Sequence, residues 1–251
     1  MTVVLKLGGS VITEKDEPET VDQAALSTAV SAIAESAVGE DIVIVHGGGS
    51  FGHHHAADYG VSTTAGTHDV DGVQAIHGAM CRLNAAVVDR LTEQGVPAVP
   101  VHPFSAAARD ADDDLSLPTT QVTTLLAEGF VPVLHGDLVA HAGAGATVLS
   151  GDELVVELAP AVDADRVGVC STVPGVLNED GTVIDRIETF EAVASALGGS
   201  DATDVSGGMA GKVRALLALS APALVFGPDA LPAFLAGESP GTTIAGDDDD
   251  W

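Results

Sequence analysis

Short apolar runs alternate along this chain with longer segments that repeat apolar residues at helical spacing. The runs predict strands over residues 2–7, 41–45, 98–101, 130–134, 166–170 and 223–226. The helical segments are 21–37, 53–59, 76–91, 119–128 and 153–158, with further helices after residue 211 and from residue 229. Strands that alternate with helices pair in parallel and bury both faces of their sheet. We therefore predict an α/β fold with a mostly parallel central sheet.

The strand and helix pattern restarts near the middle of the chain, after a predicted hairpin over residues 138–149. We expect two lobes, residues 1–150 and 151–246, followed by a solvated acidic tail over residues 247–251. A second hairpin is expected to turn at residues 178–181, and the acidic stretch 110–114 is expected to be an exposed loop.

The chain has 251 residues, 46% of them apolar, which suffices to bury one sizeable core or two intimate subdomains. No apolar run approaches the ~18 residues of a membrane span, and the sequence opens directly into a predicted strand without a charged leader. We expect a cytoplasmic protein with no membrane partner. The two cysteines, Cys81 and Cys170, have no metal-type spacing, so neither a disulfide framework nor a zinc ribbon is expected.

The formal net charge is −28, with 9 basic residues against 37 acidic ones. Such a surface repels polyanions, so we expect no nucleic acid partner. Repulsion at this density is tolerated best where salt screens it, because the Debye length falls to ~3 Å at molar ionic strength. The composition favours a halophilic cytoplasm, with an ordinary acidic protein as the alternative.

Lysine occurs only at positions 6, 15 and 212, in or beside glycine-rich segments. If lysine has been removed wherever another residue would serve, the three that remain are expected to do chemistry that no other residue can do. A mobile ammonium on a long stem suits phosphate oxygens. Lys6, Lys15 and Lys212 are therefore candidate catalytic residues.

Two glycine-rich motifs follow predicted strands: residues 6–10 read KLGGS, and residues 46–53 read HGGGSFGH. Glycines at strand ends let backbone amides approach phosphate oxygens, although a plain strand-end turn is the alternative for the first motif. The second motif also satisfies the dinucleotide fingerprint, with Asp69 or Asp71 about 20 residues further on. That fingerprint belongs to the first strand of its fold, however, and a dehydrogenase would leave the three lysines without a role.

Two further motifs place charged residues near predicted helix starts. Residues 204–212 read DVSGGMAGK and deliver Lys212 on a flexible loop. This is not a Walker A sequence, because Ser206 replaces its first glycine and Val213 replaces the residue that would hold magnesium. Residues 149–152 read LSGD, in which Asp152 is either a functional carboxylate or a helix N-cap.

Residues 53–55 are three consecutive histidines. On a helix they cannot all face one ion, and no carboxylate stands beside them at a metal-site spacing. We predict no metal site formed by protein side chains there.

Taken in order, five segments resemble the amino acid kinase superfamily over nearly the whole chain. They are KLGGSVIT at 6–13, HGGGSFGH at 46–53, LSGD at 149–152, PGV at 174–176 and DVSGGMAGK at 204–212. Within the superfamily, the histidine that closes the second segment is similar to that of the isopentenyl phosphate kinases and, less closely, to that of fosfomycin kinase. The resemblance implies an open αβα sandwich that binds the acceptor in its N-terminal lobe and ATP with Mg²⁺ in its C-terminal lobe. It also implies a homodimer.

The resemblance implies roles for particular residues. Lys6 would bridge the phosphates, Lys15 would reach the transferring group, and Lys212 would hold the ATP phosphates. Asp152 would orient Lys6, and His53 would bind the acceptor's phosphate. Further acceptor-binding positions would be Gly8, Gly48, Gly52 and Gly151. Further ATP-binding positions would be Gly9, Ser10, Gly49, Thr172, Gly175, Gly207, Gly208 and Met209. Thr172 departs from the family, which often has aspartate in the turn before PGV.

The implied reaction agrees with the chemistry of its substrates. An alcohol acceptor needs a base, but a phosphate monoester has a second pKa near ~6 and is already an anionic nucleophile at neutral pH. The obstacle is repulsion between two anions, which lysines, backbone amides and His53 would reduce. We expect ATP-dependent phosphorylation of isopentenyl phosphate in the alternative mevalonate route to isoprenoids.

Two alternatives to this reaction remain. A fosfomycin-type phosphonate kinase would need a short polar acceptor pocket, whereas an isoprenoid tail needs an apolar tunnel, expected around Ile76, Met80 and Leu83. A nucleotide-binding regulatory module without turnover has no reason to keep all three lysines.

Overall fold

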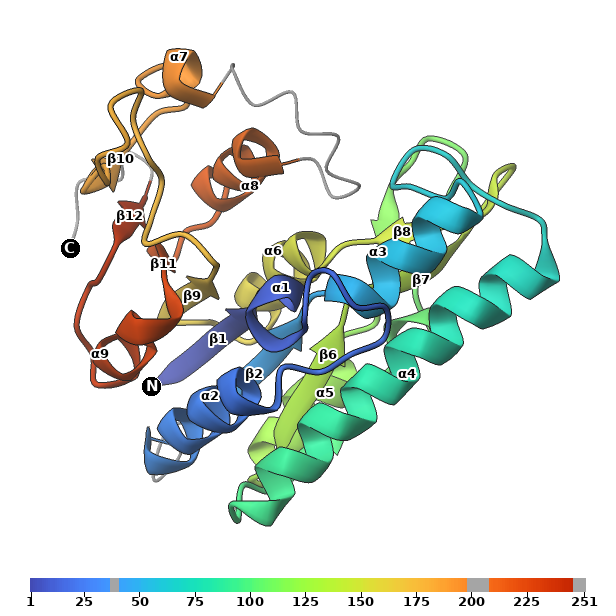
Figure 1. Ribbon diagram of the computed structural model, residues 1–251, viewed down its shortest axis with the longest axis horizontal. Helices are drawn as coiled ribbons and strands as arrows, with labels where there is room; N and C mark the ends of the chain where they lie inside the picture. The colour runs from blue at the N-terminus through green and yellow to red at the C-terminus, as the bar shows by residue number, and fades with distance from the viewer. Residues whose placement is uncertain (37–40, 198–207, 246–251) are drawn as a thin grey trace.

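The computed structural model describes residues 1–36, 41–197 and 208–245 (Figure 1), so Gly207 and the expected tail at 247–251 lie outside the described residues. The strands of the larger sheet are β1 (Thr2–Leu7), β2 (Asp41–His46), β3 (Ala98–Pro100), β6 (Val131–His135), β9 (Arg166–Cys170), β10 (Arg186–Ile187), β11 (Ala223–Phe226) and β12 (Thr242–Ile244). Their order is β10-β12-β11-β9-β1-β2-β6-β3. These strands pair in parallel except for β11 with β12, which confirms the mostly parallel α/β prediction.

Helices cover both faces of this sheet, as expected for an αβα sandwich (Figure 1). One face packs against α2 (Gln23–Ser36), α4 (Val70–Glu93) and α9 (Leu231–Leu235). The other packs against α5 (Thr120–Ala127), α6 (Gly151–Ala161) and α8 (Gly208–Leu217). The remaining helical elements are α1 (Gly9–Ile12), α3 (Gly49–Asp58), α7 (Ala194–Leu197) and the short 3-10 turns η1 (Pro103–Ser105) and η2 (Pro228–Ala230).

Side chains of β1 alternate between the two faces of the sheet, so they contribute to both layers of the core and set the direction of Lys6. Val3, Leu5 and Leu7 join the cluster under α2 and α4, whereas Val4 joins the cluster under α6. Side chains two positions apart in a strand point to the same face, so Lys6 lies on the side of Val4. A buried strand thus directs its only charged side chain toward α6.

A smaller sheet stands beyond the carboxyl end of β6. Its strands are β4 (Ala108–Arg109), β5 (Leu115–Ser116), β7 (Asp137–His141) and β8 (Gly145–Leu149), in the order β5-β4-β7-β8. The β7–β8 pair is the hairpin expected over residues 138–149, and the acidic stretch 110–114 turns between β4 and β5. A third cluster of buried residues joins this sheet to α3 and α4; it comprises Ala56, Val61, Ile76, Leu138 and Ala146.

The larger sheet is continuous across the expected boundary between lobes. Strand β1 pairs with β2 on one side and with β9 on the other, so strands from before and after residue 150 share one ladder. The division into an acceptor lobe and an ATP lobe stays a prediction.

Two helices begin earlier than the sequence indicated. We expected a loop over residues 47–52 and a helix from His53, but α3 begins at Gly49. We expected a helix from Glu153, but α6 begins at Gly151 with Ser150 as its N-cap, so the N-cap alternative for Asp152 is wrong. Glycine has a low helix propensity, which favoured the loop interpretation. Glycine is needed at such a helix start where another backbone segment comes close. A single segment of sequence does not show that approach.

That close approach is made where α1 meets α3. A Cβ atom on Gly9 would lie 2.0 Å from the backbone nitrogen of Gly49, and one on Gly49 would lie 2.1 Å from Oγ1 of Thr13. Gly49 also has a φ of +48°, in the left-handed region that favours glycine. Only glycine permits both first turns to meet at these positions.

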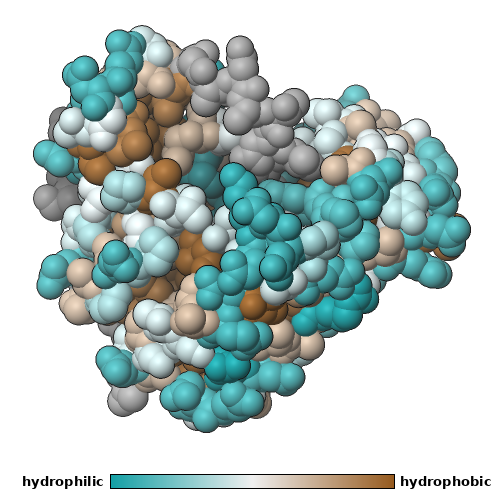
Figure 2. Space-filling model, viewed as in Figure 1, coloured by the Kyte–Doolittle hydropathy of each residue, from teal (hydrophilic) through white to brown (hydrophobic). Residues whose placement is uncertain are grey.

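On the face seen in Figure 2, hydrophilic residues predominate over α4, and hydrophobic ones gather near β10 and β12.

No helix among the described residues is long and apolar enough to cross a membrane.

We predict that Gly9→Ala lowers the free energy of unfolding by about 1–3 kcal/mol, because the new methyl group would push apart two backbone segments that cannot yield as a side chain would. Urea denaturation at constant salt measures the change. Gly78→Ala is the control: its Cβ would meet only the flexible Arg82 side chain, and we expect a gain of about 0.5–1 kcal/mol in helix stability. Equal stability of the wild type and Gly9→Ala would contradict the packing argument.

Candidate active site

The carboxyl ends of β1, β2 and β6 meet at one edge of the sheet, where each strand gives way to glycine. The backbone nitrogen of Gly8 donates to the carbonyl of Cys170 at 2.8 Å, and that of Gly136 donates to the carbonyl of His46 at 2.9 Å. Gly47 follows β2 in the same way. In open α/β sheets, ligands bind in the crevice outside these strand ends.

A buried carboxylate between two ammonium groups forms the charged centre of this edge. Lys6 Nζ lies 2.7 Å from Asp152 Oδ1, and Lys212 Nζ lies 3.0 and 2.8 Å from Asp152 Oδ1 and Oδ2. Lys6 and Asp152 are only 7% and 8% exposed. The three side chains come from β1, the first turn of α6, and α8. The structure therefore brings residues 6, 152 and 212 together, and their catalytic roles stay predictions.

Burial and charge act in opposite directions on this trio. Burial lowers the pKa of Lys6 from 10.5 to about 8, although Asp152 pulls it upward. Burial also disfavours the Asp152 carboxylate, but the charges of Lys6 and Lys212 outweigh that effect and lower its pKa to about 2. Two positive charges and one negative charge leave a net charge of +1, which suits an anionic ligand.

A cavity opens beside this trio at the strand ends. Its lining residues are Lys6, Gly9, Ser10, Gly47, Gly48, Gly49, Gly52, His53, Ala56, Ile76, Met80, Gly136, Asp137, Val148, Leu149, Ser150, Gly151, Asp152 and Lys212. The wall includes the charged trio and glycines of the strand ends. It also includes apolar side chains of α3, α4 and β8, of which Ala56, Ile76 and Val148 belong to one cluster. The cavity can therefore hold a ligand with a phosphate and an apolar tail.

His53 joins the cavity from α3, and its side chain is exposed. The same histidine borders a second, adjoining hollow that contains Lys15. Both hollows share Ser10 and Gly49, so Lys15 stands next to the main cavity.

The segment that carries Lys15 is tied to α3 and α4. Glu19 accepts two hydrogen bonds from Arg82, each at 2.9 Å, and lies 2.7 Å from His55 Nε2. At the start of the segment, the backbone nitrogen of Ser50 donates to Thr13 Oγ1 at 3.0 Å. These contacts position the exposed Lys15 relative to the helix that carries His53.

Several predicted ATP-binding residues lie away from the cavity wall. Thr172 is exposed in the turn after β9, and Gly175 is buried against Thr242 and Val183. Met209 packs against the core under α6. Gly208 begins α8 with a φ of +64° and open space around it. Their proposed contacts with ATP stay predictions. Gly8, predicted for the acceptor, is held close to Cys170 and likewise does not line the cavity.

Sequence reasoning missed part of the cavity wall. Gly136 and Asp137 follow β6 as Gly47 and Gly48 follow β2, and both pairs line the cavity. A signal was present in the sequence, because each strand ends in a histidine that is followed by glycine. Leu83, expected in an acceptor tunnel, is instead buried in the core and does not line the cavity, whereas Ile76 and Met80 do.

Metal ligands are scarce at the site. Among the described residues, no group of three or more His, Cys, Asp or Glu side chains could hold a metal ion. The absence of a metal site formed by protein side chains stays a prediction. Both oxygens of Asp152 already contact ammonium groups.

An αβα sandwich with lysines beside glycine-lined strand ends is the arrangement expected of the amino acid kinases. The profile of the amino acid kinase family matches residues 1–222. The chain belongs to the amino acid kinase family. The isopentenyl phosphate kinase of Haloferax volcanii is 66% identical over 98% of this chain and 99% of that protein. That of Methanothermobacter thermautotrophicus is 35% identical over 87% of this chain and 86% of that protein.

A solved structure described as an isopentenyl phosphate kinase superposes with a TM-score of 0.82 at 29% identity. The match covers 97% of this chain and 100% of that one. Within its family, this chain groups with the isopentenyl phosphate kinases, and it is a kinase that takes its phosphoryl group from ATP.

We predict that affinity for ATP falls about tenfold or more as pH rises through about 8, because Lys6 then loses the charge that would face the phosphates. Calorimetric titration with ATP on both sides of this pH measures the change. In Lys6→Arg the guanidinium keeps its charge, so the fall should move to higher pH. The same affinity above and below pH 8 in the wild type would refute the role of Lys6.

Proposed function

We propose that this kinase transfers the terminal phosphoryl group of ATP to isopentenyl phosphate, giving isopentenyl diphosphate and ADP in an isoprenoid route. The observation that carries the proposal is one cavity that combines the Lys6–Asp152–Lys212 trio with an apolar wall. The kinship with isopentenyl phosphate kinases supports the same acceptor.

The apolar wall favours an isoprenoid acceptor over fosfomycin. Ala56, Ile76, Met80, Val148 and Leu149 contribute apolar surface to the cavity wall. Each CH₂ group that leaves water for such a wall contributes about 0.8 kcal/mol. A short polar phosphonate would gain little there. The fosfomycin alternative is therefore not favoured.

The main task of the site residues would be to bring two anions together, ATP and the phosphate of the acceptor. The acceptor phosphate is already a nucleophile at neutral pH, with a second pKa near ~6, so no side chain is needed as a base. Lys6 and Lys212 would neutralise charge on ATP from the trio, and Lys15 would reach the transferring group from its adjoining hollow. His53 would hold the acceptor phosphate, with backbone amides of the glycine-lined strand ends around it.

Asp152 would act on the two lysines and not on the substrates. Because its carboxylate contacts both ammonium groups, it fixes their positions and leaves a single positive charge for the phosphates. A module that only binds nucleotide would not need His53 in the cavity wall and Lys15 in the adjoining hollow. The regulatory alternative is therefore less favoured.

Magnesium would arrive with the nucleotide. Mg²⁺ is usually bound through one or two carboxylates together with substrate phosphates. The described residues offer no cage of their own, so Mg²⁺ is proposed as part of the Mg·ATP substrate.

The wider setting of the enzyme is also a proposal. The charge of −28 supports a salt-rich cytoplasm, where ATP is available. The homodimer rests on the family resemblance, and light scattering of the purified chain in high salt would test it.

We predict that an ADP-release assay in high salt detects turnover with isopentenyl phosphate and none with fosfomycin or acetylglutamate. The apolar wall and the phosphate-binding charges together fit only the first acceptor. Turnover of fosfomycin alone would overturn the proposed substrate.

His53→Ala should lower kcat about 10²–10³-fold, as for loss of one donor to developing charge, while ATP still binds. Turnover kinetics and calorimetric ATP titration separate the two effects. His68→Ala is the matched control, because His68 is exposed and does not line the cavity. Unchanged turnover in His53→Ala would exclude the assigned role.

A further inference from the structure

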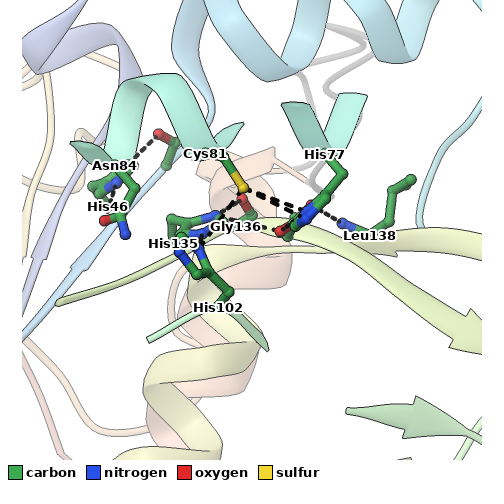
Figure 3. Close-up of polar contacts among 10 residues, drawn as sticks. His46, His77, Cys81, Asn84, His102, His135, Gly136 and Leu138 are labelled. Carbon is green, nitrogen blue, oxygen red and sulfur yellow. Dashed lines mark hydrogen bonds and ion pairs between the residues drawn. The ribbon is translucent and has the colours of Figure 1, made fainter. Parts of the chain in front are cut away.

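Two buried histidines, His46 and His135, lie close together at the ends of neighbouring strands (Figure 3). His46 ends β2 and His135 ends β6, and the two are register partners in the sheet. Their ring centroids lie 5.6 Å apart with an interplanar angle of 24°, and neither residue is exposed. Neither histidine lines the cavity, and the reaction proposed above assigns them no role.

Each ring is bonded to the peptide that follows it. Nδ1 of His46 lies 3.1 Å from the carbonyl oxygen of Gly47, and Nδ1 of His135 lies 3.0 Å from that of Gly136. Carbonyl oxygens only accept hydrogen bonds, so both Nδ1 atoms must carry the proton. The same arrangement therefore occurs twice, on neighbouring strands.

The second nitrogen of His46 faces Asn84 on α4. Nε2 lies 3.1 Å from Asn84 Oδ1, while Asn84 Nδ2 is buried without a hydrogen-bond partner in the described structure. A half-turn of the amide exchanges these two atoms. Asn84 then donates to Nε2, its buried nitrogen gains a partner, and His46 is neutral with its proton on Nδ1.

His135 is fixed in the same tautomer by a neighbour. Its Nε2 lies 2.8 Å from Nδ1 of His102, as the dashed line in Figure 3 shows. Since Nδ1 of His135 already donates to Gly136, its Nε2 must accept from His102. Burial lowers the pKa of both His46 and His135, so both rings stay uncharged at neutral pH.

The direction of each carbonyl decides where the next amide points. In a trans peptide the C=O and N–H groups point in opposite directions, and no cis peptide occurs among the described residues. The Gly47 carbonyl turns toward the buried ring of His46, so the N–H of Gly48 turns away from the core. Gly48 lines the cavity, and none of the described backbone groups accepts a hydrogen bond from this N–H.

We propose that His46 and His135 are positioning residues that act as neutral Nδ1–H tautomers and hold the Gly47 and Gly136 carbonyls toward the core. The peptides Gly47–Gly48 and Gly136–Asp137 are thereby fixed in the cavity wall, and the Gly48 N–H is presented to an acceptor phosphate. The proposal deepens the function given above and rests on it for the identity of that phosphate.

The tautomers are tested without any turnover. Long-range ¹H–¹⁵N spectra of the imidazole rings, assigned with His46→Asn and His135→Asn, should show a protonated Nδ1 and a bare Nε2 in both residues. Free histidine prefers the opposite tautomer, so the expected pattern is distinctive. A proton on Nε2 of either ring would overturn the proposal.

The anion-binding consequence is tested by titration and kinetics. Adding inorganic phosphate or isopentenyl phosphate should shift the Gly48 amide resonance. His46→Phe keeps a ring but no donor, and it should raise the KM for isopentenyl phosphate about tenfold while leaving the KM for ATP unchanged. His46→Asn returns an amide near the Nδ1 position, so it should recover most of the loss.

Equal rises in both KM values, or identical behaviour of His46→Phe and His46→Asn, would instead indicate a purely structural role and refute the proposal. His141→Phe is the control, because His141 is a partly buried histidine of β7 that bonds Thr147 and does not line the cavity.

If the wild type fails to use isopentenyl phosphate, the proposed function fails. The tautomer spectra and the phosphate-induced shift then still decide the positioning role, as they do if His46→Phe does not fold.

Discussion

The compensation of charge around Asp152 is the interaction on which the rest of the site depends. A carboxylate that is 8% exposed can stay ionised only because two ammonium groups contact it, and Lys6 can stay charged below about pH 8 only because Asp152 faces it. The three partners come from a strand, a helix start and a second helix. Their mutual attraction therefore joins three separate parts of the chain at the point where phosphates would bind.

Much of this arrangement could be predicted from the sequence. The alternating strands and helices indicated the parallel sheet, and the scarcity of lysine indicated which residues gather at its edge. Lys6 and Lys212 are 206 positions apart, yet both contact Asp152. The order and spacing of the motifs along the chain carried the prediction that these residues belong to one site.

The parts that could not be predicted depend on contacts between distant segments. The backbones of Gly9 and Gly49 approach each other closely where α3 starts, and neither segment alone reveals the other. Strands β10 and β12 are too short for a periodic pattern to stand out. The paired histidines were not recognised, because His46 and His135 become neighbours only through the register of β2 with β6.

Strand β1 hydrogen-bonds to both β2 and β9, and this central place limits how the two halves of the chain can move. A hinge motion that separated the two halves would have to break the hydrogen bonds of β1 with either β2 or β9. Any closing motion around bound ligands must then come from sliding of helices, or from a change in sheet twist. During catalysis the central strands of the sheet would accordingly stay fixed relative to one another, and the surrounding helices and loops would move.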